Sequence, residues 1–357
     1  MSDAHLAARV TIDLKALQAN YRTLQGVAKG AEVGVAIKGE AYGLGSARCG
    51  QALWEAGCRS FFVARPQEGE DLRAVLADAT IYVLDGLYAG EAGYYLKHKL
   101  TPALISYEEA EEWARDGKGA ACAIHIDSGI NRVSFSASEA ERLAKAKLPL
   151  NIALVMSHLA SSEEFDNPYN ETQRARFEAV RQLFPGVRAS LANSSGHFHG
   201  PAFTLDLTRA GIALYGGNPK PGQPNPMQPV ATLEARVLQL RDMPKGEVIG
   251  YNSTWKAERD TKIALVGAGY RDGIPRRMSS SFGTSYVWLG GKRCPIVGRV
   301  SMDMTAIDVT DANVKRGDYA EFFGHHILLD DAATAAGTIS WELLTHLGSR
   351  YARHYLT

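Results

Sequence analysis

Short apolar runs alternate with amphipathic stretches over the first two thirds of the chain. The runs are nearly continuous rather than alternating apolar and polar, which is typical of parallel strands that are covered on both faces. We predict eight such strands, at residues 33–38, 60–64, 81–84, 102–105, 121–127, 151–159, 188–193 and around 207–209.

Helical periodicity fills most of the intervals between these strands. The apolar positions there recur every three to four residues, as they do on one face of a helix. Helices are expected at residues 47–56, 68–76, 107–115, 137–146 and 171–183. Eight strands that alternate with helices predict an α/β fold, a (β/α)₈ TIM-type barrel. An open doubly wound sheet is the alternative that this pattern leaves open.

The pattern changes after Gly217. Residues 218–226 contain four prolines and cannot continue a helix. Beyond them, glycine turns separate alternating β-type segments at residues 230–240, 262–266, 285–289, 293–300 and 304–309, with one helix at 339–347. We therefore predict two domains: a barrel domain over residues 1–225 and a mainly-β C-terminal domain over residues 226–357.

Charge and cysteine content narrow the classes of function. Lys plus Arg equals Asp plus Glu at 39 each, which argues against a nucleic-acid or membrane-surface partner. The 4 cysteines form no CxxC pair and are expected to be free thiols of a cytoplasmic protein. The histidine pairs 197/199 and 325/326 lack a third ligand at useful spacing, so no metal site is predicted.

Lys38 is the first candidate for chemistry. It ends an apolar strand, at the edge where barrel enzymes keep their active sites. A lone lysine at a strand end usually just extends into solvent. Here Tyr42 adds a hydroxyl four residues later, and Gly43 and Gly45 allow a tight turn.

The Lys38 segment, Lys-Gly-Glu-Ala-Tyr-Gly-Leu-Gly, resembles the cofactor-lysine motif of the alanine racemase family. Each further segment that resembles the family is only moderately specific alone, but all of them follow in the family's order. These segments are residues 126–132, 156–158, 191–195, 209–216, 250–251, 269–273, 298–303 and 337–339.

The resemblance implies racemisation of a small amino acid, most directly L-alanine to D-alanine, with pyridoxal 5'-phosphate as cofactor. Lys38 would hold the cofactor covalently and act as one catalytic base. Tyr251, from the partner subunit of a homodimer, would be the base on the opposite face. Racemisation needs both, since one base removes the α-proton and the other returns a proton to the far side.

The resemblance also implies the remaining contacts. Arg209 would face the pyridine nitrogen, and its permanent charge would keep that nitrogen unprotonated. Arg132 would reach the phenolic oxygen of the cofactor and the substrate, and the Met302 amide would reach the substrate carboxylate. The other cofactor contacts would be His158 and Trp341 beside the ring and, at the phosphate, Tyr42, Ser194, Gly211 and Ile212.

Four of the departures from the family bear on the expected function. His125 stands where many members have a lysine modified to a carbamate, and a neutral imidazole offers Arg132 only one acceptor. Trp341 replaces a tyrosine, Ile130 a common methionine and Arg271 a common alanine. These changes leave open a broader substrate range that includes serine, or a catalytically weak cofactor-binding relative.

Other pyridoxal-phosphate proteins with a similar barrel are less favoured. A decarboxylase or a D-threonine-type aldolase should lack the second-domain Gly-Tyr motif, whereas Tyr251 is present here. A cofactor carrier should resemble the barrel alone, whereas this chain continues into a long second domain.

Overall fold

The computed structural model describes residues 6–357, which form two compact units. The barrel unit comprises residues 17–214 and 218–228. The β-unit comprises the N-terminal residues up to Ala16, residues 215–217 and residues 229–357. The predicted boundary between residues 225 and 226 stays a prediction.

Eight parallel strands form the barrel, in the order β8-β7-β6-β5-β4-β3-β2-β9. The ring closes between its two end strands, because Asp206 N donates to Ala189 O at 3.2 Å and Arg209 N donates to Ala192 O at 2.9 Å. This closure confirms the predicted barrel over the open sheet. The strands are β2 (Glu32–Ala36), β3 (Ser60–Val63), β4 (Thr80–Val83), β5 (Thr101–Leu104), β6 (Ala121–His125), β7 (Asn151–Met156), β8 (Arg188–Ser190) and β9 (Leu207–Ala210).

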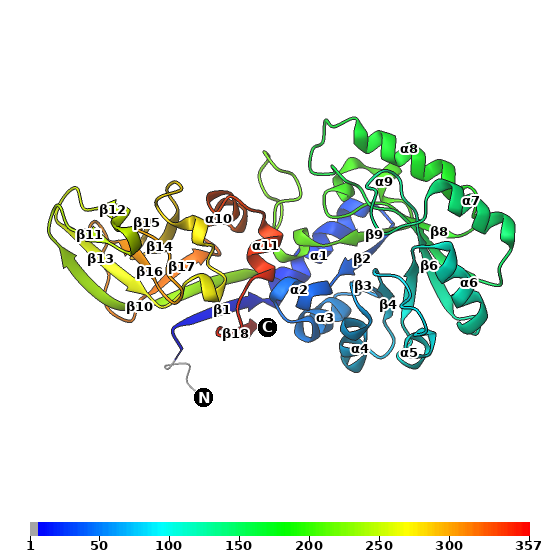
Figure 1. The fold of residues 1–357 in the computed structure, drawn as a ribbon, viewed down its shortest axis with the longest axis horizontal. Helices are drawn as coiled ribbons and strands as arrows, with labels where there is room; N and C mark the ends of the chain where they lie inside the picture. Colours follow the sequence, from blue (N-terminus) through cyan, green and yellow to red (C-terminus); the bar gives the residue numbers. More distant parts are fainter. Residues whose placement is uncertain (1–5) are drawn as a thin grey trace. The chain divides into compact units, whose positions relative to one another are not determined.

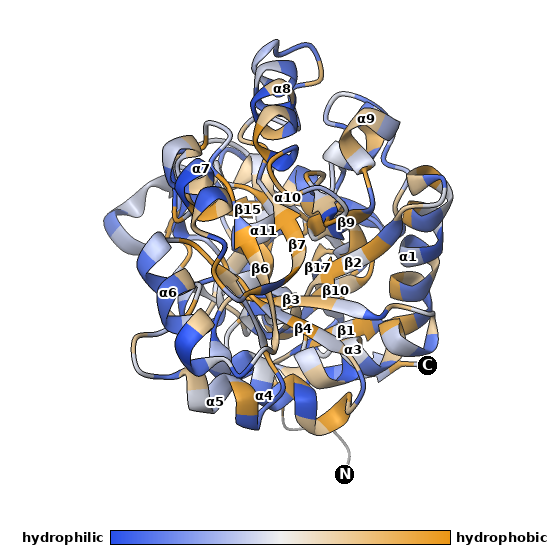
Figure 2. Cartoon of the chain, turned by 90° about the vertical axis from the view of Figure 1, so that its right-hand side faces the viewer, coloured by the Kyte–Doolittle hydropathy of each residue, from blue (hydrophilic) through white to orange (hydrophobic). Residues whose placement is uncertain are grey.

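Helices surround these strands (Figure 1). Figure 2 shows the consequence of their amphipathic sequences: hydrophobic strands lie inside a ring of helices that carry much hydrophilic surface. Ser106 and Ser136 accept the N3 amide at the starts of α6 and α7, as good N-caps do. The helices are α1 (Leu14–Ala28), α2 (Lys38–Gly43), α3 (Ser46–Glu55), α4 (Pro66–Val75), α5 (Ala92–Lys97), α6 (Tyr107–Asp116), α7 (Ala137–Ala146), α8 (Tyr169–Arg181) and α9 (Pro201–Thr204).

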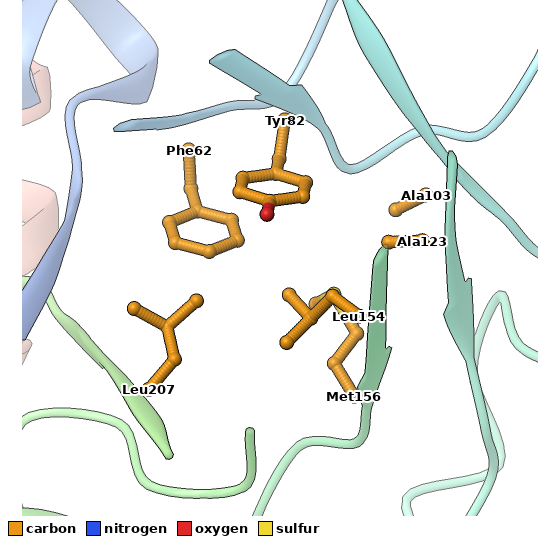
Figure 3. Close-up of a cluster of buried hydrophobic side chains, with 7 residues drawn as sticks. All are labelled: Phe62, Tyr82, Ala103, Ala123, Leu154, Met156 and Leu207. Atoms are coloured by element: carbon orange, nitrogen blue, oxygen red, sulfur yellow. The ribbon is translucent and has the colours of Figure 1, made fainter. Parts of the chain in front are cut away.

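Side chains fill the barrel interior (Figure 3). The rings of Phe62 and Tyr82 stack with centroids 4.8 Å apart, and Ala103 and Ala123 leave room for them on the neighbouring strands. Leu154, Met156 and Leu207 complete this buried cluster. Because the interior is packed, polar chemistry is confined to the loops at the ends of the strands.

The β-unit is built on a sheet with the strand order β13-β16-β15-β14-β17-β10-β1-β18, and β10 also pairs with β13. The five predicted strands are confirmed, whereas β1, β17 and β18 were not predicted. The strands are β1 (Ala8–Asp13), β10 (Ala231–Met243), β13 (Thr261–Val266), β14 (Tyr286–Leu289), β15 (Lys292–Val297), β16 (Thr305–Asp308), β17 (Tyr319–Phe323) and β18 (Ala352–Leu356), beside a small pair β11 (Val248–Ile249) and β12 (Trp255–Lys256).

Two short helices, α10 (Leu329–Ala335) and α11 (Ser340–Thr345), follow the sheet, the second within the predicted 339–347 helix. No helix in the described part of the chain has the length and apolar character that a membrane crossing requires.

Candidate active site

Lys38 follows β2 and begins an unusual turn. Gly39, Glu40, Ala41 and Tyr42 all have left-handed backbone angles, with φ between 53° and 60°. Such angles cost roughly 1–2 kcal/mol for each residue that carries a Cβ. The surrounding structure therefore imposes this turn, and it buries Tyr42 immediately beyond the lysine.

Glu68 holds the start of this turn. Its Oε1 accepts from Gly39 N at 2.7 Å, and its Oε2 accepts from Ala64 N at 2.7 Å and Arg65 N at 3.1 Å. Glu68 was not among the residues predicted from the sequence. The signal was a glutamate at the third position of α4, where a carboxylate commonly caps the helix N-terminus.

Two arginines and two carboxylates act on the Lys38 amine. Burial lowers its pKa, and the charge of Arg132 lowers it further, with a smaller contribution from Arg209. The carboxylates of Glu68 and Asp85 oppose this effect. A lysine with a lowered pKa is more often neutral, so its nitrogen can act as a nucleophile or a base.

Arg209 lies near the end of β9 and is buried. Its guanidinium donates to the Ser190 hydroxyl and to the carbonyls of Ser157 and Leu191, and no carboxylate pairs with it among the described residues. Burial lowers the pKa of Arg209 to about 9, at which it still carries its charge at pH 7.

His158 lies beside this guanidinium, with its Nδ1 3.4 Å from the Arg209 nitrogen. Arginine can only donate, so Nδ1 accepts and Nε2 carries the ring proton. Burial and the charge of Arg209 hold the pKa of His158 well below its usual value. The imidazole at the end of β7 is therefore neutral.

Two hydroxyls flank a bare stretch of backbone after β9. Ser194 Oγ accepts from Gly211 N at 2.9 Å and from Ala213 N at 3.2 Å. A Cβ at Gly211 would lie 2.6 Å from Tyr42 Oη and 3.8 Å from Ser194 Oγ. Only glycine leaves this cradle open, and Ile212 begins a short 3₁₀ turn beside it. Hydroxyls and close backbone suit a phosphate, so the cradle and Lys38 together fit pyridoxal phosphate.

Arg132 is exposed in the loop that follows β6, and its guanidinium contacts no acceptor in the described part of the chain. His125 is buried at the end of β6, and neither of its ring nitrogens has a hydrogen-bond partner among residues 6–357. Burial, with Arg209 and Arg132, lowers the pKa of His125 to about 3. The imidazole is neutral, and it does not hold Arg132.

The β-unit carries the other predicted residues. Tyr251 is 67% exposed and Met302 is 51% exposed. Their loops adjoin, because Tyr270 N donates to Ser301 O at 2.9 Å and a Cβ at Gly250 would lie 3.3 Å from Arg299 N. Trp341 is half-buried on α11. The barrel unit thus brings together the site residues that were predicted around Lys38 and the cradle. The β-unit places Tyr251 and Met302 on adjoining loops.

The family model for the alanine racemase N-terminal domain matches residues 12–219, and that for the C-terminal domain matches residues 230–355. The chain belongs to the alanine racemase family. Both domain models match, so it is not a barrel-only cofactor carrier. An alanine racemase of Methylobacterium nodulans is 46% identical, covering 98% of this chain and 96% of the relative. That of Acidiphilium cryptum is 44% identical, covering 96% and 97%.

A solved member of the alanine racemase family has the same fold. The crystal structure of alanine racemase from Bartonella henselae, with covalently bound pyridoxal phosphate, is 36% identical and has a TM-score of 0.93. It covers 98% of this chain and 99% of its own. Within residues 6–357, no three side chains of the types that ligate metals gather as a metal site.

Proposed function

We propose that this chain interconverts L-alanine and D-alanine through two proton-transferring side chains, Lys38 and Tyr251. The reaction follows from the relatives, which are named alanine racemases and match nearly the whole chain at 40–46% identity. The cofactor is pyridoxal phosphate. The observation that carries the assignment of Lys38 is its amine of lowered pKa, joined by the turn 39–42 to the Tyr42–Gly211 cradle.

Each residue has one task in this proposal. Lys38 binds the cofactor and exchanges a proton with the α-carbon from one face, and Tyr251 does so from the other. Bound pyridoxal phosphate withdraws electrons from the α-carbon and so makes its proton acidic. Arg209 faces the ring nitrogen with a charge that no carboxylate neutralises, which disfavours a proton there and with it side reactions such as transamination.

The remaining predicted contacts belong to the same proposal. Arg132 meets the phenolic oxygen and the substrate, and the Met302 amide meets the substrate carboxylate. His158 and Trp341 lie beside the ring. The phosphate is held by the residues of the cradle, namely Tyr42, Ser194, Gly211 and Ile212.

We further infer a homodimer in which each active site uses Tyr251 of the partner subunit. The support is an exposed apolar surface on adjoining loops of the β-unit, formed by Tyr251, Tyr270, Met302 and Met304. Exposed apolar surface of this kind is typical of subunit interfaces. A cytoplasmic location suits the four cysteines, which are buried free thiols.

Chemical labelling tests the assignment of Lys38. Borohydride reduction of the yellow holoenzyme should fix the cofactor mass on the peptide that contains Lys38. Lys38→Ala should retain no label, whereas Lys118→Ala, at an exposed loop position, should label like wild type. Loss of optical rotation of L-alanine reports the activity in parallel. Label on another lysine, or no retained cofactor at saturation, would overturn the proposal.

A further inference from the structure

The loop that carries Arg132, residues 127–135, is shaped mainly by its own backbone. At its base Asp127 N donates to Phe135 O and Phe135 N donates to His125 O, both at 2.7 Å. Inside it, the Asp127 carboxylate accepts from Gly129 N at 2.7 Å and from Asn131 N at 3.1 Å. These bonds set the shape of the Arg132 loop, but they do not connect the middle of the loop to the rest of the barrel unit.

Helix α8 makes that attachment with two side chains one turn apart. Tyr169 Oη donates to Gly129 O at 2.7 Å. Gln173 is fully buried, and its Nε2 donates to Ser128 Oγ at 3.3 Å and to His158 O at 3.0 Å. Its Oε1 accepts from the Ala160 amide at 2.8 Å. Side chains four residues apart share one helix face, so both reach the same loop.

Gly129 leaves the space that this contact needs. A Cβ there would collide with Tyr169 Oη and would lie 2.9 Å from an Arg176 nitrogen. The φ of Gly129 is +132°, which a residue with a Cβ rarely adopts. A glycine at position 129 therefore lets the loop come close enough to α8 for the hydrogen bond from Tyr169.

The same helix contacts reach the buried side of the site. Ser128 Oγ and Ser157 Oγ are 2.7 Å apart, and the Ser157 carbonyl accepts from Arg209. Gln173 thus joins the loop of Arg132 to the strand end that carries His158. His125, whose carbonyl accepts from Phe135 N at the base of the loop, makes no hydrogen bond through its ring in the described part of the chain.

We propose that Tyr169 and Gln173 are positioning residues that hold the Arg132 loop against the barrel and so set where Arg132 meets cofactor and substrate. The inference rests on the proposed contacts of Arg132. In this chain the arginine is positioned from α8, on the outer side of the loop, rather than from His125 beneath it. Misplacement of a binding group by about 1 Å can cost on the order of a hundredfold in rate.

The first test removes the two contacts singly in the holoenzyme. Tyr169→Phe and Gln173→Met should each lower kcat/KM for L-alanine by about tenfold to a hundredfold. The cofactor should stay bound, and its absorbance band should shift because the charge of Arg132 moves relative to the phenolic oxygen. Unchanged kinetics and an unchanged band in Tyr169→Phe would overturn the proposal.

Matched controls remove equivalent bonds elsewhere in the barrel unit. Tyr95→Phe deletes a hydroxyl that donates to Gly86 O at 2.6 Å, and Gln18→Met deletes an amide that donates to Ala52 O at 2.9 Å. Both should keep wild-type kinetics and the wild-type band. Losses as large as those of the α8 variants would show a general effect of packing and would overturn the proposal.

A double-mutant cycle decides whether the two residues act through Arg132. In an Arg132→Ala background, Tyr169→Phe should move neither the band nor the remaining rate by more than about threefold, since coupled residues are not additive. Full additivity would overturn the positioning role. Labelling at Lys38 distinguishes failure of the proposed function from failure of the positioning inference. If Lys38 is labelled but the cycle is additive, only the positioning inference fails.

Discussion

Around Arg209 the site is built from neutral groups, and no carboxylate pairs with this cation among the described residues. Arg209 is satisfied by hydroxyl and carbonyl oxygens and by a neutral His158, so its positive charge is not cancelled. A second buried histidine, His125, lies in the field of the same arginine. Burial and the neighbouring positive charges lower the pKa of Lys38, His125, His158 and Arg209. The uncancelled positive charge suits an anionic, electron-withdrawing cofactor.

His125 makes a prediction about stability in acid. Its pKa is about 3 in the folded chain and near 6.5 when unfolded. Between these values the unfolded chain binds more protons, so stability is complete above about pH 6.5 and is lost as the pH falls toward 3. The loss from this residue should reach about 2 kcal/mol at pH 5.

The urea midpoint of the holoenzyme at pH 7 and pH 5 measures this effect. His125→Leu cannot titrate, so its midpoint should fall less between the two pH values than that of wild type. His325→Leu, at an exposed position, should behave like wild type. An equal fall in wild type and His125→Leu would contradict the assignment of a neutral, buried imidazole.

The residues that the sequence analysis identified are those with a chemical signature in a local motif, such as Lys38, Arg209 and Ser194. Gln173 has no such signature, because a glutamine in a polar helix usually faces solvent. Only the fold shows that its amide is buried between two loops. The sequence also left open whether His125 holds Arg132, and in the described part of the chain the buried His125 ring makes no hydrogen bond.

At the scale of elements, one turn and one glycine together form the cradle. The left-handed turn at residues 39–42 brings the Tyr42 hydroxyl to the bare backbone of Gly211. Neither element forms a binding site alone. The strain of the turn is compensated by packing around it and by the hydrogen bond that Gly39 N donates to Glu68.

Gly211→Ala tests the cradle. The added Cβ would lie 2.6 Å from Tyr42 Oη and would displace the hydroxyl or the backbone. We expect affinity for pyridoxal phosphate to fall at least tenfold, which corresponds to about 1.4 kcal/mol. A spectral titration of the apoenzyme with the cofactor measures it.

Gly93→Ala is the matched control, because a Cβ at Gly93 would meet nothing within 4 Å. It should bind the cofactor like wild type. Unchanged affinity in Gly211→Ala would show that the phosphate does not use this cradle.

The eight barrel strands and the helices α3, α4, α6, α7 and α8 were predictable, because each strand is a short apolar run and each of these helices has a helical period of apolar residues. The helices α1, α2, α5 and α9 were not predicted. The strands β1 and β18 were not predictable, since both are only partly buried and their pairing joins the two ends of the chain. Arg9 lies opposite Ala352 in that register. No local pattern encodes a partner so far away in sequence.

At the scale of the whole molecule, the two proposed catalytic residues belong to separate units. Lys38 is in the barrel unit, and Tyr251 is in the β-unit with most of its side chain exposed. A proposed catalytic side chain that is mostly exposed on its own unit does not form a complete active site there. A second copy of the chain would supply the missing half, and two-fold symmetry would then give two identical sites.

Mixed dimers test this sharing. Lys38→Ala and Tyr251→Phe should each be inactive alone, because each homodimer lacks one base at both sites. After subunit exchange, half of the dimers should be mixed, and each should carry one intact site with Lys38 from one subunit and Tyr251 from the other. Activity should therefore return to about a quarter of wild type. If both bases came from one chain, every site in the mixed dimer would still lack a base, so verified exchange without recovery would refute the shared site.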